Sequence, residues 1–131
     1  MTTKRGLATP TIEVDNQVVA IKPNTLSYQN GDGELTVRPQ IAGAGAIETV
    51  LTKDAETQRS MVKFSLITEA GNISLKDGWK RKSEELAGVA IRFSDEGFTR
   101  AFRAMRLIND PEIAIGVDAD FELEFMGDPT A

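Results

Sequence analysis

Residues 113–126 read IAIGVDADFELEFM, and this stretch decides the fold that we expect. Its odd-numbered positions are all apolar, whereas four of its even-numbered positions are acids: Asp118, Asp120, Glu122 and Glu124. Successive side chains of a β-strand point to opposite faces. The pattern therefore predicts one long strand, which buries an apolar face and presents a row of carboxylates on the other.

This row of acids has three interpretations. A half-buried strand with a solvated face is the ordinary one. Like charges on one strand repel each other, and the nearby Arg100, Arg103 and Arg106 are candidates to neutralise them. If copies of the chain close into a symmetric ring with this face inward, the acids instead line a channel. The sequence leaves all three open.

The segments before this strand predict an antiparallel meander. Residues 86–93 and 98–107 have strand-like patterns, and short polar turns join them to each other and to residues 113–126. Sequential strands joined by short turns pair as neighbours in most sheets. Because strands and helices do not alternate along the chain, we expect no parallel α/β sheet.

Two further strand pairs are expected nearer the N-terminus. Residues 11–14 and 17–22 flank Asp15-Asn16, which suits a tight hairpin turn because both residue types tolerate positive φ values. Residues 46–53 and 61–68 form the second candidate pair, joined by a polar turn. Together with the meander, these pairs make the chain mainly β.

One helix is expected in the middle of the chain. Asn72 or Ser74 is a candidate cap, and Asp77 follows Ser74 at the spacing of a capping box. Trp79 lies one turn after Leu75 on the same face. We expect Trp79 to fill a space in the core rather than to hold a ligand.

Residues 30–46 form the most unusual part of the chain. Between glycines at both ends, apolar and polar residues alternate as in an extended strand. Pro39 cannot donate a backbone hydrogen bond to a sheet, so we expect an edge or a projecting arm. The glycines that hinge it would be Gly31, Gly33, Gly43 and Gly45. We expect its contacts with another subunit to come from Leu35, Val37, Arg38, Pro39 and Ile41.

The composition narrows the function classes. The chain has 131 residues, enough for a single domain (1–131), and has neither cysteine nor histidine. It lacks the residues of disulfides, of the common zinc sites and of Ser-His-Asp or Cys-His catalysis. Its net charge of −5 argues against nonspecific nucleic-acid binding, which depends on Lys and Arg at phosphates. Without a long apolar run or a secretory signal, we expect synthesis in a cytoplasm.

We expect no enzyme, no cofactor and no metal site. Four acids along one strand form a stripe, whereas hydrolases need carboxylates that converge from several elements in a pocket. The glycines at 31–33 and 43–45 lack the Lys-Ser/Thr of a phosphate-binding loop. A carboxylate-dependent hydrolase is therefore the least favoured alternative.

The order and character of these elements resemble the tail tube (major tail) proteins of long-tailed bacteriophages. The resemblance extends from about residue 12 to residue 129. Its pieces are the N-terminal hairpin that leads into VAIKPNTL (19–26), the segment GELTVRPQ (33–40), a strand ending in VKFSL (62–66), a helix around DGWK (77–80) and the closing strand FELEFMG (121–127).

This resemblance implies a two-sheet β-sandwich or partial barrel with one flanking helix and a long extended loop. It implies a structural virion protein whose hexameric rings stack into the tube that conducts DNA into the host. An N-terminal arm (1–11) and the loop 30–46 would reach neighbouring subunits, and the four acids would face the lumen. Further partners would be tail tip, tape measure and terminator proteins, with a sheath protein in contractile tails. Assembly would take place in the bacterial cytoplasm, without a membrane partner.

Two alternatives remain open. The related tube of a contractile injection or secretion machine shares these features and carries protein effectors instead of DNA. A monomeric β-sandwich module that binds a sugar or a peptide would instead need a concave site that bears aromatic side chains.

Overall fold

The computed structural model describes residues 10–41, 43–95 and 97–128. These residues form nine β-strands, one α-helix and two short 3-10 turns, so the expected mainly β, sandwich-like fold with one helix is confirmed. The strands are β1 (Thr11–Val14), β2 (Gln17–Val19), β3 (Ser27–Gln29), β4 (Leu35–Ile41), β5 (Ile47–Lys53), β6 (Ser60–Ile67), β7 (Val89–Asp95), β8 (Phe98–Leu107) and β9 (Asp120–Gly127). The helix α1 spans Ala70–Ser83, and the 3-10 turns η1 and η2 span Gly43–Gly45 and Ala55–Thr57.

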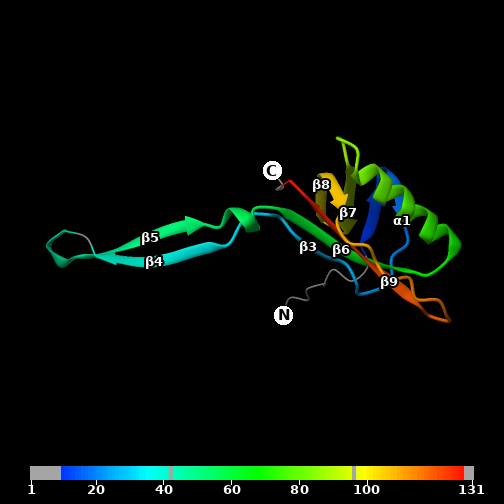
Figure 1. Ribbon diagram of the computed structural model, residues 1–131, viewed down its shortest axis with the longest axis horizontal. Coiled ribbons are helices and arrows are strands. Elements are labelled where there is room, and N and C mark those ends of the chain that lie inside the picture. The colour runs from blue at the N-terminus through cyan, green and yellow to red at the C-terminus, as the bar shows by residue number, and fades with distance from the viewer. Residues whose placement is uncertain (1–9, 42, 96, 129–131) are drawn as a thin grey trace.

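Seven of the strands form one antiparallel sheet in the order β2-β1-β7-β8-β9-β6-β3, which includes the expected meander. β8 joins its two halves, because most of β8 pairs with β7 while Arg106 and Leu107 pair with β9. A bulge bends the sheet there: Ala104 has a φ of 52°, and the register with β7 shifts between Val89 and Ile91. As a result, β1, β7 and β8 run across β3, β6 and β9 (Figure 1), as in orthogonal sheet packing.

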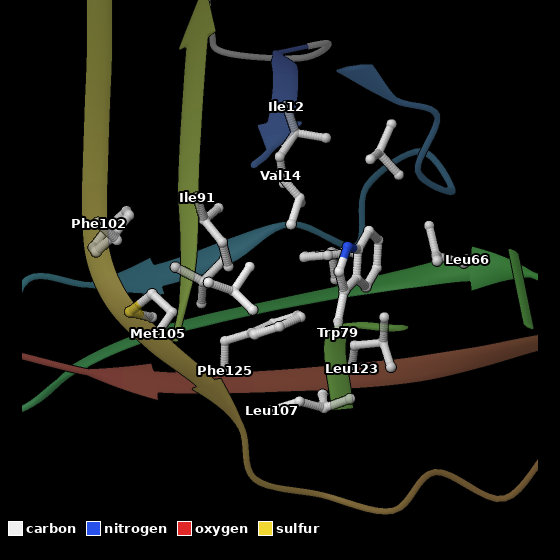
Figure 2. Close-up of a cluster of buried hydrophobic side chains, with 14 of the residues drawn as sticks. Ile12, Val14, Leu66, Trp79, Ile91, Phe102, Met105, Leu107, Leu123 and Phe125 are labelled. Carbon is white, nitrogen blue, oxygen red and sulfur yellow. The ribbon is translucent and has the colours of Figure 1, made fainter. Parts of the chain in front are cut away.

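The core lies between the two halves of this bent sheet, and α1 closes it. Phe64 of β6 stacks on Phe125 of β9 with 5.6 Å between ring centroids, and Trp79 of α1 packs edge-on against both rings. Ile91 and Met105 join the same cluster from β7 and β8 (Figure 2). The prediction that Trp79 fills a space in the core is confirmed, because its side chain is only 5% exposed.

Helix α1 begins after Glu69, whose side chain makes no capping hydrogen bond. The prediction that Asn72 or Ser74 caps the helix is wrong. Both lie inside the helix, and the Asn72 amide donates a hydrogen bond to the Ile67 carbonyl at the end of β6. The chain enters the helix almost directly from β6, so these polar residues come too late to cap it.

The C-terminal end of α1 is attached to β8. The Arg106 guanidinium donates hydrogen bonds to carbonyl oxygens that a helix end would otherwise leave unpaired, those of Ser83, Glu85 and Leu86. The Ser83 hydroxyl donates to the Trp79 carbonyl at 2.7 Å and accepts from the Leu107 amide at 2.8 Å. These contacts fix the helix over the core.

The predicted N-terminal hairpin is confirmed. Asp15 and Asn16 form the turn between β1 and β2 with φ values of 51° and 66°. The Asp15 carboxylate also accepts from the Ala90 amide and lies 2.6 Å from the Lys82 ammonium. The hydrogen bond that Lys82 donates to Asp15, together with the charge of this carboxylate, raises the pKa of Lys82 above its usual value. Lys82 is therefore fully charged at neutral pH, and the stability that its raised pKa contributes is lost as the pH rises through that pKa.

The predicted strand over residues 113–126 is too long. The chain turns at Gly116 and Asp118, where Asp118 has a φ of 59°, and β9 begins only afterwards. Ile115 and Val117 are 91% and 95% exposed instead of facing the core. The alternation of apolar and polar residues in the sequence therefore extends beyond the strand itself, into the turn at Gly116 and Asp118.

The predicted pairing of residues 46–53 with residues 61–68 is wrong. β5 pairs with β4 in a separate two-stranded sheet. β6 pairs with β3 on one side and with β9 on the other, so both of its edges are occupied. The polar residues 54–58 therefore form the base of a projecting hairpin rather than a turn between two paired strands.

Candidate interaction surface

β4 and β5 form a hairpin that projects from the seven-stranded body (Figure 1). Seven residue pairs join the two strands, from Leu35 opposite Lys53 to Ile41 opposite Ile47. Within the described residues neither strand has another sheet neighbour, so the outer edge of each is open. Pro39 lies within β4, consistent with the expectation of an edge strand.

One face of this hairpin is mainly apolar, with Thr49 and Lys53 as its polar residues, and it is uncovered. Residues directly opposite each other in an antiparallel pair lie on the same face, which brings the aliphatic side chains of both strands together. Each is between 56% and 78% exposed: Leu35, Val37, Ile41, Ile47 and Leu51. We call these five residues the hairpin face. Contiguous exposed apolar patches mark interaction sites, and the hairpin face is therefore the leading candidate.

The predicted inter-subunit residues divide between the two faces of the hairpin. Strand alternation places four of them on the apolar side, namely Leu35, Val37, Pro39 and Ile41. Arg38 lies on the opposite side. Sequence reasoning missed Ile47 and Leu51, because it paired their strand with β6. A signal for this pairing was present in the sequence. When the two strands are placed side by side, Ile47 lies opposite Ile41 and Leu51 lies opposite Val37.

Hydrogen bonds brace the base of the hairpin. The Thr57 hydroxyl accepts from the Glu34 amide at 2.6 Å and donates to the Asp54 carbonyl at 2.9 Å, while the Asp54 amide donates to the Glu34 carbonyl. Gly31 lies nearby with a φ of 87°. A Cβ on Gly31 would lie 2.6 Å from the carbonyl carbon of Arg59, so the chain passes too closely here for any other residue.

The four predicted hinge glycines occupy two different places. Gly31 and Gly33 lie where the chain leaves the body for the hairpin, and Gly43 and Gly45 lie in the turn at its far end. The second pair therefore reverses the chain within the hairpin, whereas the prediction had it at the end of a single extended arm. We call this far end, with the paired residues Ile41 and Ile47 beside it, the hairpin tip.

The predicted row of four acids is shorter in the structure. Asp118 lies in the turn before β9, and the strand itself carries the other three, Asp120, Glu122 and Glu124. Asp120 lies 2.6 Å from the Lys22 ammonium, and Glu124 lies 3.6 Å from that of Lys63. The acid between them is exposed, as is Asp118. The row is therefore partly neutralised.

The cations beside the row are not the expected arginines. Arg106 holds the end of α1, and Arg100 stacks on Phe98 with its guanidinium 4.6 Å from the ring centroid. The lysines that pair with the acids come from β6 and from the loop between β2 and β3. Their position beside β9 depends on the strand order, which sequence patterns do not give.

A groove of about 600 Å³ opens between β2 and β3, the two edge strands of the large sheet. Its lining is mainly apolar and includes Val18, Ile21, Leu26, Tyr28 and Phe98. Val18 is 64% exposed. The Arg100 guanidinium lies over the rings of Phe98 and Tyr28, so the groove is flanked by a positive charge. We call this feature the edge groove.

The N-terminal arm predicted over residues 1–11 lies almost wholly outside the described residues. Pro10 lines the edge groove, and Thr11 already belongs to β1. Thr11 is therefore part of the sheet and not of an arm.

Other kinds of site were sought in the same part of the chain. Residues 10–41, 43–95 and 97–128 contain no group of three or more acidic side chains placed to hold a metal ion. The helix found there is not long and apolar enough to cross a bilayer. Comparisons of the chain with protein-family models, with curated proteins and with solved structures found no match.

Proposed function

We propose that this chain is a structural subunit that assembles with copies of itself and forms the tail tube of a long-tailed bacteriophage. The hairpin face carries the proposal. Five aliphatic side chains lie exposed on a two-stranded sheet, and the body of the same chain does not cover them. A two-stranded hairpin is only marginally stable in water by itself, so this one has most to gain from a partner.

Covering the hairpin face would release a useful amount of free energy. Full burial of one aliphatic side chain contributes about 1.5–3 kcal/mol. The five side chains of the hairpin face are half-exposed or more, and their burial would contribute roughly 5 kcal/mol per copy. Part of this is offset by the cost of fixing two chains relative to each other, so several contacts per subunit are needed for a stable assembly.

The position of the hairpin favours head-to-tail assembly. It projects from one end of the body (Figure 1), which leaves it free to contact a surface elsewhere on the next copy. Contacts between two different patches close into rings or continue as filaments. A tube of stacked rings combines the two, because its subunits close into rings and its rings continue as a filament. Assembly would also cover the edges of β2 and β3, which end the large sheet.

The charge of the chain suits a conduit for DNA. Lys and Arg at phosphates would hold DNA in place, whereas a chain with a net charge of −5 lets it slide. Asp118 and Glu122 are the exposed acids of the predicted row, and we assign them to the lumen. Asp120 and Glu124 are ion-paired with lysines, so they would contribute less to the negative electrostatic potential of the lumen.

The test is a variant in which the whole hairpin face becomes polar. The substitutions are Leu35→Thr, Val37→Thr, Ile41→Thr, Ile47→Thr and Leu51→Thr, which keep strand propensity. Electron microscopy and sedimentation are expected to show rings or tubes for the wild-type chain. The variant is expected to sediment as a folded monomer with unchanged circular dichroism.

A matched control changes the opposite face of the hairpin. Thr36→Gln and Thr52→Gln replace exposed residues there, and this variant is expected to assemble like the wild-type chain. A wild-type chain that stays monomeric at every protein and salt concentration would contradict the proposal. So would a hairpin-face variant that assembles as well as the control.

The second candidate function is a monomeric binding module for a small apolar or aromatic ligand. The edge groove favours it, because Tyr28 and Phe98 line a concave, largely apolar space. The same sedimentation experiment separates the two functions, since a binding module stays monomeric with or without the hairpin face.

A further inference from the structure

We propose that the hairpin tip of one copy inserts into the edge groove of the next copy. The inference rests on the proposed self-assembly and names the surface that receives the hairpin. Ile41 and Ile47 supply the inserted side chains, and the space between β2 and β3 receives them.

The hairpin tip has the shape of an apolar knob. Ile41 and Ile47 lie directly opposite each other in the register of β4 and β5, next to the turn. Side chains opposite each other in an antiparallel pair have Cβ atoms about 5 Å apart, so the two form one continuous projection. They are also the most exposed residues of the hairpin face, at 78% and 75%.

The edge groove has the size and chemistry to receive this knob. Its volume of about 600 Å³ is ample for two isoleucine side chains, and its lining is mainly aliphatic and aromatic. Val18 stands exposed at its side. In the part of the chain that the structure describes, β2 and β3 have no outer strand neighbour, so a hairpin inserted between them would also come close to the backbone groups of these edges.

The hairpin cannot reach the groove of its own chain. Each strand of the hairpin has seven residues, which is about 23 Å at the rise of an antiparallel strand. The tip therefore stands far out from the body, as Figure 1 shows. Its receptor must belong to a second copy, and the contact is of the head-to-tail kind.

Charges beside the knob and the groove are complementary. Glu48 follows Ile47, is exposed and pairs with Gln40, and Arg38 lies on the same face two residues further from the tip, opposite Val50. Beside the groove lies the Arg100 guanidinium, stacked on Phe98. The acid at the hairpin tip therefore has a base of opposite charge beside the groove. The pairing of Glu48 with Arg100 is the one to test. Glu48 adjoins Ile47 in the chain, although its side chain starts from the opposite face of β5, and the Arg100 guanidinium covers the Phe98 ring of the groove.

Another exposed apolar site is less suitable as the receptor. Ile115 and Val117 are almost fully exposed in the turn before β9. They project from the surface, however, and do not line any of the described hollows, so they cannot enclose the knob. They serve as the competing receptor in the experiment.

Cysteine cross-linking tests the contact directly, because the chain has no cysteine of its own. Full-length Ala46→Cys, at the hairpin tip, is mixed with full-length Val18→Cys, in the groove, and oxidised while the two assemble. Disulfide-linked pairs are expected in at least about tenfold excess over mixtures with Leu86→Cys or Ile115→Cys. Both control sites are more than nine-tenths exposed.

Charge exchange tests the same contact without cysteines. Glu48→Arg and Arg100→Glu should each raise the protein concentration needed for assembly by about fivefold, the range of a surface ion pair. The double variant should return to the wild-type value. Near-ultraviolet circular dichroism of Arg100→Glu shows whether the Phe98 and Tyr28 environment survives.

The outcomes separate this inference from the proposed function. If the wild-type chain assembles but Ala46→Cys links equally to all partners, or preferentially to Ile115→Cys, the groove is not the receptor and self-assembly still stands. A double charge variant no better than either single one also overturns the inference. If the wild-type chain never assembles, both proposals fail together.

Discussion

Phe64 lies fully buried between the rings of Phe125 and Trp79, where the two halves of the sheet meet. Phe64→Ala removes the stacked ring and leaves a cavity, so we expect the free energy of unfolding to fall by about 3–5 kcal/mol. Urea denaturation followed by Trp79 fluorescence measures this. Leu86→Ala, at a 95% exposed position, is the control and should change it by less than about 0.5 kcal/mol. If Phe64→Ala and Leu86→Ala lowered the free energy of unfolding equally, the central place of Phe64 in the core would be wrong.

Ser83 joins α1 to β8 through a single hydroxyl. Ser83→Ala leaves the buried Leu107 amide without its acceptor, and we expect a loss of about 1–3 kcal/mol in the free energy of unfolding. Ser74→Ala, an exposed serine of the same helix, should have little effect. The comparison is made by thermal denaturation of both variants, and a larger loss at Ser74 would disprove this role for Ser83.

For single residues, the sequence predicts whether a side chain is buried better than it predicts which side chain it pairs with. Alternation correctly places Phe121, Leu123 and Phe125 in the core, because a strand side chain has only two possible faces. The ion pairs of Asp120 and Glu124 could not be predicted in the same way. Their lysines lie far away in the sequence and come alongside only through the order of the strands.

The hairpin of β4 and β5 is an element that the body does not need. Among the described residues of 35–53 none belongs to the buried core, and the Asp54 amide already donates to the Glu34 carbonyl across the base. Replacing residues 35–53 by Asn-Gly should therefore change the free energy of unfolding by less than about 1 kcal/mol. Urea denaturation measures this, and sedimentation should show a monomer.

A second excision serves as the reference for this one. Removing the same number of residues from within the core, over β9 and its preceding turn, should abolish cooperative unfolding. If the hairpin excision did the same, β4 and β5 would belong to the fold itself, and their role as a projecting contact element would be wrong.

The elements with strong turn chemistry were predictable, and those that depend on choice of partner were not. Asp15-Asn16 specifies the first hairpin by itself. Residues 46–53 could pair with either neighbour, and Pro39 argued against β4 as a paired strand. Pairing with an edge strand tolerates proline, and the matching aliphatic residues of the two strands decided the outcome.

For the whole molecule, the assignment of acids to a lumen makes a testable prediction. Asp118→Lys and Glu122→Lys together should leave folding and assembly intact, because neither acid is ion-paired to a lysine as Asp120 and Glu124 are. The assembled variant should retain double-stranded DNA. The amount of DNA retained should fall steeply as the salt concentration is raised. Fluorescence anisotropy of labelled DNA measures it.

A charge-matched variant controls for net charge. Glu84→Lys and Glu85→Lys, exposed residues after α1, change the net charge by the same amount. This variant should retain less DNA than the first if Asp118 and Glu122 face the lumen. Equal retention by both would place these acids on the outside.

The projecting hairpin also gives any assembly of this chain a direction. Where the contact joins successive rings, one end of the tube still presents bare tips and the other presents unfilled grooves, so addition has no intrinsic stopping point. A separate component must terminate growth, and it must resemble either the tip or the groove. A short peptide that copies residues 38–50 should then act as a chain stopper, and it should block only one of the two ends.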